Sequence, residues 1–228
     1  DFDGTITTSD LSSDLAAFYG GSEYMRIEQE YRTRAIPIKV WLRRIAGYLP
    51  ADLDLLLNRA MQRAVMRPGF DTFLEYARDR NRPVIIASDG FGFYIEPILR
   101  AWGLLDQVSY IYRNETVQDG QTLVINNPHA HPVCQVCGNC KAAHVLALKD
   151  KKHPVIYIGD GSNDRFGASW GDHVCARDRL AVICKELNYN YSQWIDFYDI
   201  IKVPEPAISD RSATSLCCPR GNGVKETP

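Results

Sequence analysis

Short apolar runs alternate with helix-like segments along much of the chain. Residues 83–87 (PVIIA) and 154–158 (PVIYI) have the pattern of buried strands, and a weaker strand is predicted at 173–176. The segment at 91–102 has a helical pattern that ends at Gly103. Buried strands separated by helices predict a parallel sheet covered by helices on both faces.

Residues 11–67 have a different pattern, which is helical almost throughout. Apolar residues recur at helical spacing, first at Ile38, Trp41, Leu42, Ile45 and Leu49 and then at Leu53, Leu57, Met61 and Ala64. Pro68 and Gly69 mark the end of this block. We therefore expect a helical block at 11–67 inserted into a core made of 1–10 and 68–203.

Two further segments depart from this alternation. Two β-rich runs between 108 and 126 flank Gln118-Asp119-Gly120, which predicts a hairpin. Residues 204–228 are rich in Ser, Pro and Gly, and we expect this tail to be disordered.

Composition narrows the class of protein. The 228 residues are 45% hydrophobic and carry a formal net charge of −2, which is ordinary globular composition. No basic cluster is long enough to follow a nucleic-acid backbone, and no apolar run is long enough to span a membrane. The seven cysteines are an odd, clustered set, which favours a reducing cytoplasmic setting over a secreted disulfide framework.

Candidate chemistry lies mainly after the predicted strands. The candidates are Asp1 and Asp3 in DFDGT, Ser88 after the strand at 83–87, Lys141 at the start of a helical segment, and Asp160 and Asp164 in IGDGSND. Ligands of open parallel sheets bind beyond the carboxyl ends of the strands, so these residues are expected to meet there.

Each residue type suits one part of phosphate chemistry. A carboxylate can attack phosphorus to form an acyl phosphate, and a second one can exchange protons with the leaving group and water. A serine hydroxyl and a lysine ammonium bind phosphate oxygens, and carboxylates bind Mg²⁺. Taken singly, these residues are typical of turns, helix caps and surface positions.

The ordered set of four motifs resembles the haloacid dehalogenase-like superfamily over residues 1–187. The resemblance implies a Rossmann-like α/β core in which the helical block at 11–67 is a cap that closes over the substrate. It also implies the following roles: Asp1 as nucleophile, Asp3 as general acid and base, Ser88 and Lys141 as phosphate binders, Asp1, Asp160 and the backbone carbonyl of Asp3 as Mg²⁺ ligands, and Asp164 as their support.

A His/Cys-rich loop at 127–141 (NPHAHPVCQVCGNCK) narrows the resemblance. This loop before the lysine is similar to the branch that contains the methionine-salvage phosphatase, which acts on 2-hydroxy-3-keto-5-methylthiopentenyl-1-phosphate, and the phosphoethanolamine/phosphocholine phosphatases. The salvage enzymes commonly have Ser-Gly-Gly where this chain has Ser88-Asp89-Gly90.

The resemblance therefore implies a Mg²⁺-dependent hydrolase of a small phosphomonoester, with the methionine-salvage enol phosphate as the leading substrate. Phosphoethanolamine, phosphocholine, pyridoxal phosphate and phosphoserine are the alternative substrates. A non-catalytic metal-binding relative is the alternative from another class, although all four motif acids are intact. The family also has a buried strand before the nucleophile, so we expect upstream residues and a less stable or less active chain without them.

The His/Cys loop is itself a candidate second metal site. Its closely spaced His and Cys side chains are typical zinc ligands, at His129, His131, Cys134, Cys137 and Cys140. The spacing is not a pair of separated C-x-x-C motifs, and one short loop would have to supply every ligand. We therefore expect reduced thiols that pack the loop, with zinc as the alternative.

Overall fold

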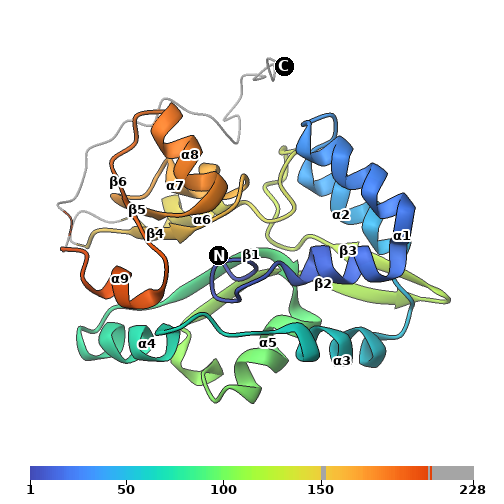
Figure 1. The fold of residues 1–228 in the computed structure, drawn as a ribbon, viewed down its shortest axis with the longest axis horizontal. Helices are drawn as coiled ribbons and strands as arrows, with labels where there is room; N and C mark the ends of the chain where they lie inside the picture. Colours follow the sequence, from blue (N-terminus) through green and yellow to red (C-terminus); the bar gives the residue numbers. More distant parts are fainter. Residues whose placement is uncertain (150–152, 205, 207–228) are drawn as a thin grey trace.

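The computed structural model describes residues 1–149, 153–204 and 206. In these residues helices surround two three-stranded sheets (Figure 1). The helices are α1 (Leu11–Arg32), α2 (Ile38–Ala46), α3 (Leu53–Arg63), α4 (Phe70–Asp79), α5 (Gly92–Ala101), the 3₁₀ turn η1 (Leu105–Gln107), α6 (Lys141–Leu148), α7 (Asp164–Ala168), α8 (Asp178–Glu186) and α9 (Phe197–Ile201). The strands are β1 (Ile85–Phe91), β2 (Tyr110–Asp119), β3 (Thr122–Asn126), β4 (Ile156–Gly159), β5 (His173–Ala176) and β6 (Tyr191–Gln193).

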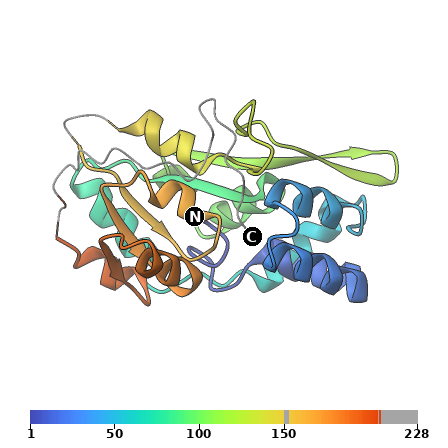
Figure 2. The ribbon, with the colours of Figure 1, turned by 90° about the horizontal axis from the view of Figure 1, so that it is seen from above.

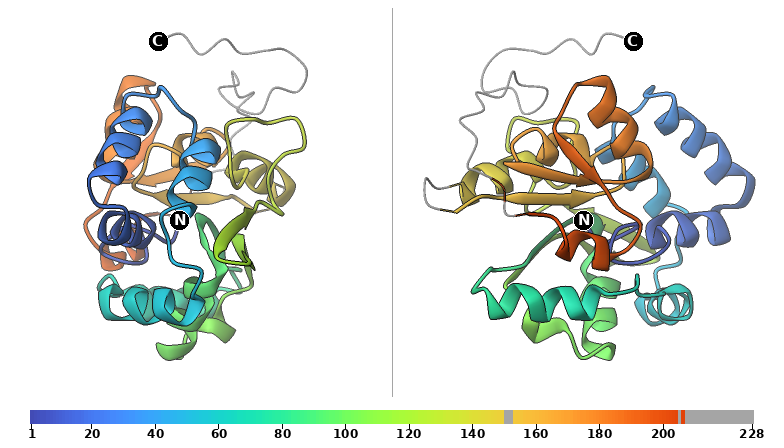
Figure 3. Two further views of the ribbon diagram at one scale, coloured as in Figure 1. Left: turned by 90° about the vertical axis from the view of Figure 1, so that its right-hand side faces the viewer. Right: turned by 60° about the vertical axis from the view of Figure 1, so that its left-hand side comes forward.

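The sheets combine parallel and antiparallel pairing. β1 pairs in parallel with β2, β2 and β3 form an antiparallel hairpin, and β4, β5 and β6 are all parallel. Figure 3 shows α4 and α5 on one side of the N-terminal segment and α8 on the other. The predicted α/β core with helices on both faces is confirmed, as is the hairpin at 108–126.

Asp1 lies between the two sheets, and its α-ammonium group donates to the Ile158 carbonyl at 3.0 Å (Figure 1). Ile158 belongs to β4 and immediately precedes Gly159 and Asp160. The first motif is therefore held at the end of β4, where parallel sheets bind ligands.

Two strands differ from the sequence prediction. Ser88-Asp89-Gly90 were expected to end β1, but the strand continues to Phe91 with an irregular register after Ala87. The Asn114 side chain donates to the Asp89 carbonyl at 2.7 Å and replaces regular ladder pairing there. β6 was not predicted, because its three residues carry no apolar run.

The helical pattern of 11–67 is confirmed as α1, α2 and α3. The apolar positions predicted in α2 are buried, whereas in α3 the buried residues are Leu56 and Ala60, and Met61 is exposed. The difference arises because α3 packs against both α1 and the core helix α5, so its buried stripe faces two neighbours. Figure 2 shows the β2–β3 hairpin (yellow-green) extending past α2, and α2 contacts β3.

The two connections to the helical block run side by side. Thr7 and Met66 form an isolated antiparallel bridge. The adjacent Arg67 guanidinium donates to the carbonyls of Gly4 at 2.6 Å, Thr5 at 2.7 Å and Thr7 at 3.2 Å. These charge-assisted hydrogen bonds fix the loop that carries the first motif.

The predicted disordered tail falls almost entirely outside the described residues. Among the described helices, none has both the length and the apolar character needed to cross a bilayer.

Candidate active site

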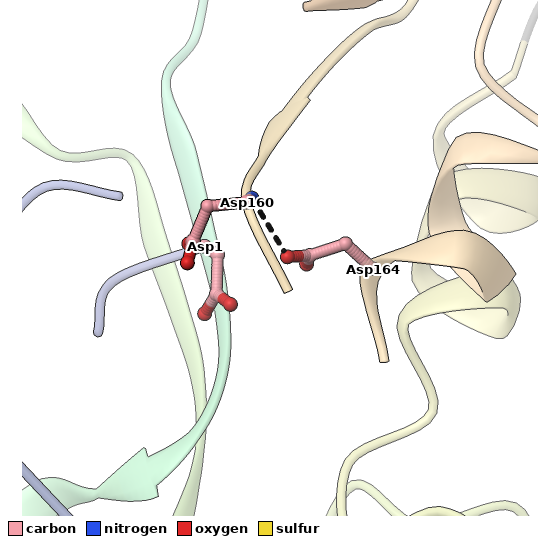
Figure 4. Close-up of side chains that lie close together, drawn as sticks. All are labelled: Asp1, Asp160 and Asp164. Atoms are coloured by element: carbon pink, nitrogen blue, oxygen red, sulfur yellow. Dashed lines mark hydrogen bonds between the residues drawn. The ribbon is translucent and has the colours of Figure 1, made fainter. Parts of the chain in front are cut away.

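Three carboxylates from two distant parts of the sequence meet between the two sheets. One ligand oxygen from each of Asp1, Asp160 and Asp164 lies within 4.8 Å of the others (Figure 4). Asp1 starts the chain, Asp160 follows β4 directly, and Asp164 begins α7. The structure thus brings together residues that the sequence analysis assigned to one site.

Lys141 joins two of these acids. Its ammonium nitrogen lies 2.7 Å from Asp1 Oδ2 and 2.7 Å from Asp164 Oδ1, and its side chain is only 2% exposed. Lys141 is the first residue of α6, which contacts α7, so two short helices bring the pair together. The sequence placed this lysine at a helix start, and the structure confirms that placement.

Asp164 uses both carboxylate oxygens for hydrogen bonds. Tyr157 donates to Oδ1 at 2.6 Å, and the backbone N–H groups of Asp160 and Gly161 donate to Oδ2 at 3.1 and 2.8 Å. With Lys141 also on Oδ1, this carboxylate orients the lysine and the glycine-rich turn. These bonds are consistent with the supporting role expected for Asp164, which stays a prediction, as does metal ligation by Asp1 and Asp160.

Burial and neighbouring charges shift the pKa values of the ion pair. Burial raises the pKa of Asp164, but Lys141 and the N-terminal ammonium outweigh it and hold that pKa below its ordinary value. Burial lowers the pKa of Lys141, but Asp164 and other neighbouring groups raise it above its ordinary value. Both groups are therefore charged at neutral pH.

Asp160 is a further carboxylate beside the ion pair of Lys141 and Asp164, and its negative charge has no ion-pair partner of its own in that pair. Burial and the nearby Asp164 carboxylate raise the pKa of Asp160 to about 6, although Thr5 donates a hydrogen bond to it at 2.5 Å. A divalent cation relieves such repulsion, and Mg²⁺ takes hard oxygen ligands from one or two carboxylates. The side chains of Asp1 and Asp160 fit that requirement.

Two glycines make room for these groups. Gly4 has φ +76°, and a Cβ there would lie 2.4 Å from Asp160 Oδ2. A Cβ on Gly90 would lie 2.4 Å from Asp3 Oδ2 and 3.2 Å from Ser88 Oγ. Any side chain at either position would displace a carboxylate of the site, so the glycines of DFDGT and Ser-Asp-Gly serve the same purpose.

The side chains of Ser88 and Asp3 therefore both lie close to Gly90. Ser88 is buried, and its Oγ accepts the Gly90 N–H at 3.0 Å, so its own O–H can be donated to a ligand oxygen. Burial, with a smaller effect of the Asp10 charge, raises the pKa of Asp3 to about 8. At neutral pH this carboxyl group holds a proton, as a general acid requires.

The sequence analysis missed a buried asparagine that fixes the lysine loop. Asn139 donates from its side chain to the carbonyls of Ser88 at 2.7 Å and Tyr112 at 2.8 Å. Its Oδ1 accepts from His144 Nε2, and its backbone N–H donates to Asp89 Oδ1 at 2.9 Å. The position two residues before Lys141 was the only signal in the sequence, and it does not reveal these partners.

The His and Cys side chains of the loop do not form a close group of three or more possible metal ligands among the described residues. In the part of the chain that the structure describes, the one group of three or more His, Cys, Asp or Glu side chains with closely spaced ligand atoms is Asp1, Asp160 and Asp164. The predicted loop ligands do not form such a group: Cys134, Cys137 and Cys140 are buried with Phe166, and His129 packs against the Tyr112 ring. The burial of the three thiols fits the expectation of thiols that pack the loop, and the zinc alternative stays a prediction for elemental analysis.

Asp89, where this chain departs from Ser-Gly-Gly, predicts a pH-dependent stability. Burial raises its pKa from 3.8 to about 6, so the unfolded chain ionises first as pH rises and the folded state becomes less stable between these values. We expect Asp89→Asn to be more stable than the parent by about 1–3 kcal/mol above pH 6 and equal to it below pH 4. Urea unfolding at pH 4 and pH 8 measures this.

Asp119→Asn is the matched control for that experiment, because Asp119 is exposed at the end of β2. It should change stability little at either pH. A destabilisation by Asp89→Asn at pH 8 would mean that the ionised carboxylate strengthens the bond to the Asn139 N–H by more than its burial costs.

Known proteins are similar to this chain over most of its length. The chain is 31% identical over 220 residues to a 2-hydroxy-3-keto-5-methylthiopentenyl-1-phosphate phosphatase of Lysinibacillus sphaericus (strain C3-41), covering 93% of this chain and 95% of that protein. It is 32% identical over 205 residues to the protein of the same name from Exiguobacterium sibiricum, covering 88% of this chain and 92% of that protein.

Solved structures share the fold at lower identity. A phosphoserine phosphatase solved as a phospho-aspartyl intermediate analogue superposes with a TM-score of 0.68 at 19% identity, covering 89% of this chain and 95% of that chain. The family described as haloacid dehalogenase-like hydrolase matches residues 1–168. The chain therefore belongs to the haloacid dehalogenase-like hydrolase family.

Proposed function

We propose that the chain is a Mg²⁺-dependent phosphomonoester phosphatase that acts through a phosphorylated Asp1. The observation that carries this proposal is the buried Lys141, which bridges Asp1 and Asp164 beside the Asp160 carboxylate. A structural ion pair needs one carboxylate. Here a third acid lies next to the pair, and burial and Asp164 raise its pKa, as is common at functional sites.

The first half-reaction transfers the phosphoryl group to the protein. An Asp1 carboxylate oxygen attacks phosphorus, the bond from phosphorus to the ester oxygen breaks, and the departing oxygen takes a proton from Asp3. Lys141 and the Ser88 hydroxyl hold the phosphoryl oxygens. Bound Mg²⁺, held by Asp1, Asp160 and the Asp3 carbonyl, would neutralise phosphate charge.

The second half-reaction regenerates Asp1. Asp3 is now a carboxylate and takes a proton from water as the water oxygen attacks phosphorus. The bond between phosphorus and the Asp1 oxygen breaks, which releases inorganic phosphate and restores the proton on Asp3. The same residue thus serves as acid in one step and base in the next.

The leading substrate is the methionine-salvage ester 2-hydroxy-3-keto-5-methylthiopentenyl-1-phosphate. Its support is the name of relatives that are about 30% identical over most of both chains. We place the cap at 11–67 and the core at 1–10 and 68–203. The cap's helices pack on the β2–β3 hairpin and on α5, so a small substrate would be enclosed between cap and core.

The test is phosphate release from a panel of small esters, first with Mg²⁺ and then with EDTA. The panel holds the methionine-salvage ester, phosphoethanolamine, phosphocholine, pyridoxal phosphate and phosphoserine. We expect release that EDTA abolishes and Mg²⁺ restores, with the salvage ester having the highest kcat/KM. Release that EDTA leaves unchanged would refute the role of the acidic site, and a preference for another ester would reassign the substrate.

A further inference from the structure

Tyr94 contacts Asp3, the residue that must deliver and collect the proton. Its hydroxyl donates to Asp3 Oδ2 at 2.5 Å, and its side chain is 0% exposed. Tyr94 comes from α5, which packs on β1 and β2 of the core. This bond was not visible in the sequence, where Tyr94 is one aromatic among Phe91 and Phe93 in an apolar helix.

The Tyr94 hydroxyl has a second partner from the cap. Ser12 Oγ lies 2.8 Å from it and is buried in the first turn of α1. With the tyrosine hydrogen donated to Asp3, the serine O–H donates to the phenolic oxygen. Ser12, Tyr94 and Asp3 therefore form a chain of hydrogen bonds from the cap to the acid.

The other oxygen of Asp3 is held from the same turn of the cap. The Leu11 N–H donates to Asp3 Oδ1 at 3.1 Å. Each carboxyl oxygen thus has one fixed donor, and together the two donors set the rotation of the carboxyl group. The Leu11 bond depends on where α1 lies, whereas the Tyr94 bond is anchored in the core.

The Tyr94 ring is itself fixed by packing. It makes edge contacts with the rings of Phe91 and Phe93, at centroid distances of 6.1 and 5.2 Å, and lies 6.3 Å from the Phe2 ring. Phe2 is the residue between the two catalytic acids. A hydroxyl on so rigid a ring can hold a carboxyl group to a single orientation.

We propose that Tyr94 is a positioning residue, which aims the Asp3 carboxyl group at the ester oxygen that leaves, with Ser12 holding the Tyr94 hydroxyl. The inference rests on the proposed function, in which Asp3 protonates the leaving group. It concerns the orientation of Asp3 and requires no change in its protonation.

Leaving groups of different basicity distinguish positioning from a structural role. A basic leaving group needs the proton of Asp3 as it departs, whereas p-nitrophenolate leaves with little help. The leaving groups of p-nitrophenyl phosphate and phenyl phosphate differ in basicity, whereas the two esters are similar in size. Because kcat/KM reports the steps up to loss of the leaving group, it measures the acid role of Asp3 apart from its later base role.

The test is kcat/KM of Tyr94→Phe with both esters in the presence of Mg²⁺. We expect a loss of about 10- to 100-fold for phenyl phosphate and less than about threefold for p-nitrophenyl phosphate. Ser12→Ala should shift the same ratio in the same direction by a smaller factor. Tyr191→Phe, in the outer strand β6, is the control and should leave both values unchanged.

Equal losses with the two esters in Tyr94→Phe would overturn the inference, as would no loss with either. Phe keeps the ring packing, so the melting temperature should stay near that of the parent. If Tyr94→Phe does not fold, an unchanged ester ratio in Ser12→Ala overturns the inference. Phosphate release by the parent from the ester panel tests the proposed function separately. A parent that releases phosphate there, with equal losses for the two aryl esters in Tyr94→Phe, would keep the function and overturn this inference alone.

Discussion

Asp1→Asn is expected to abolish phosphate release while leaving the fold intact. The amide cannot form the acyl phosphate, and loss of a catalytic nucleophile costs on the order of 10⁴-fold or more in kcat. The side chain is also the ion-pair partner of Lys141 and, in the proposed mechanism, would hold Mg²⁺, so the replacement affects three functions together. Phosphate release with saturating ester and Mg²⁺ measures the effect.

The control for this variant is Asp119→Asn, which makes the same chemical change at an exposed carboxylate. It should keep full activity. Asp1→Asn should also unfold cooperatively near the parent's melting temperature, because Lys141 retains its bond to Asp164. Full activity in folded Asp1→Asn would remove Asp1 from the chemistry and favour a nucleophile elsewhere.

The grouping of the candidate residues could be predicted from the sequence because most of them lie at or near the ends of predicted strands. Asp160 follows β4 at once, so the strand pattern fixes its place at the edge of the sheet. The same reasoning placed Ser88 next to Asp3, and Gly90 confirms that they are neighbours. A glycine at a fixed offset carries this information because a side chain at Gly4 or Gly90 would meet a carboxylate of the candidate site.

The supporting residues could not be predicted in the same way. Tyr94 and Tyr157 each place one hydroxyl on a motif carboxylate, but their sequence neighbourhoods are those of ordinary buried helix and strand positions. Asn139 forms its bonds to β1 and β2 only after both strands are assembled. Partners that depend on tertiary packing leave no local pattern.

The fold, too, has features that the local sequence pattern predicts and features that only contacts between elements determine. Apolar runs gave the long helices and the buried strands, because periodicity reports which face is covered. The continuation of β1 through Ser88-Asp89-Gly90 depends on the Asn114 side chain from β2, and the buried stripe of α3 depends on its two neighbours α1 and α5. Both features are set by contacts between elements, which override local preference.

Lys141→Met is expected to destabilise the folded state by about 3–5 kcal/mol, because it leaves Asp164 buried and without its counter-charge. The lysine is 2% and Asp164 0% exposed, so water cannot replace the lost partner. Met has nearly the length of the lysine stem and fills the same space. Urea unfolding without Mg²⁺ measures the loss, since a bound cation would otherwise compensate part of it.

Lys202→Met is the matched control for the same substitution at an exposed pair. Lys202 is 73% exposed and lies 3.5 Å from Asp199, and such pairs contribute less than about 1 kcal/mol. The double variant Lys141→Met with Asp164→Asn should recover part of the loss, because the uncompensated charge is gone. The amide oxygen can accept the two N–H groups that Asp164 Oδ2 accepts, and the amide NH2 can donate to the Tyr157 hydroxyl at the other position. If the double variant is as unstable as the sum of the single variants, the cost lies in packing around α6 and α7, and the buried charge is not what Lys141 compensates.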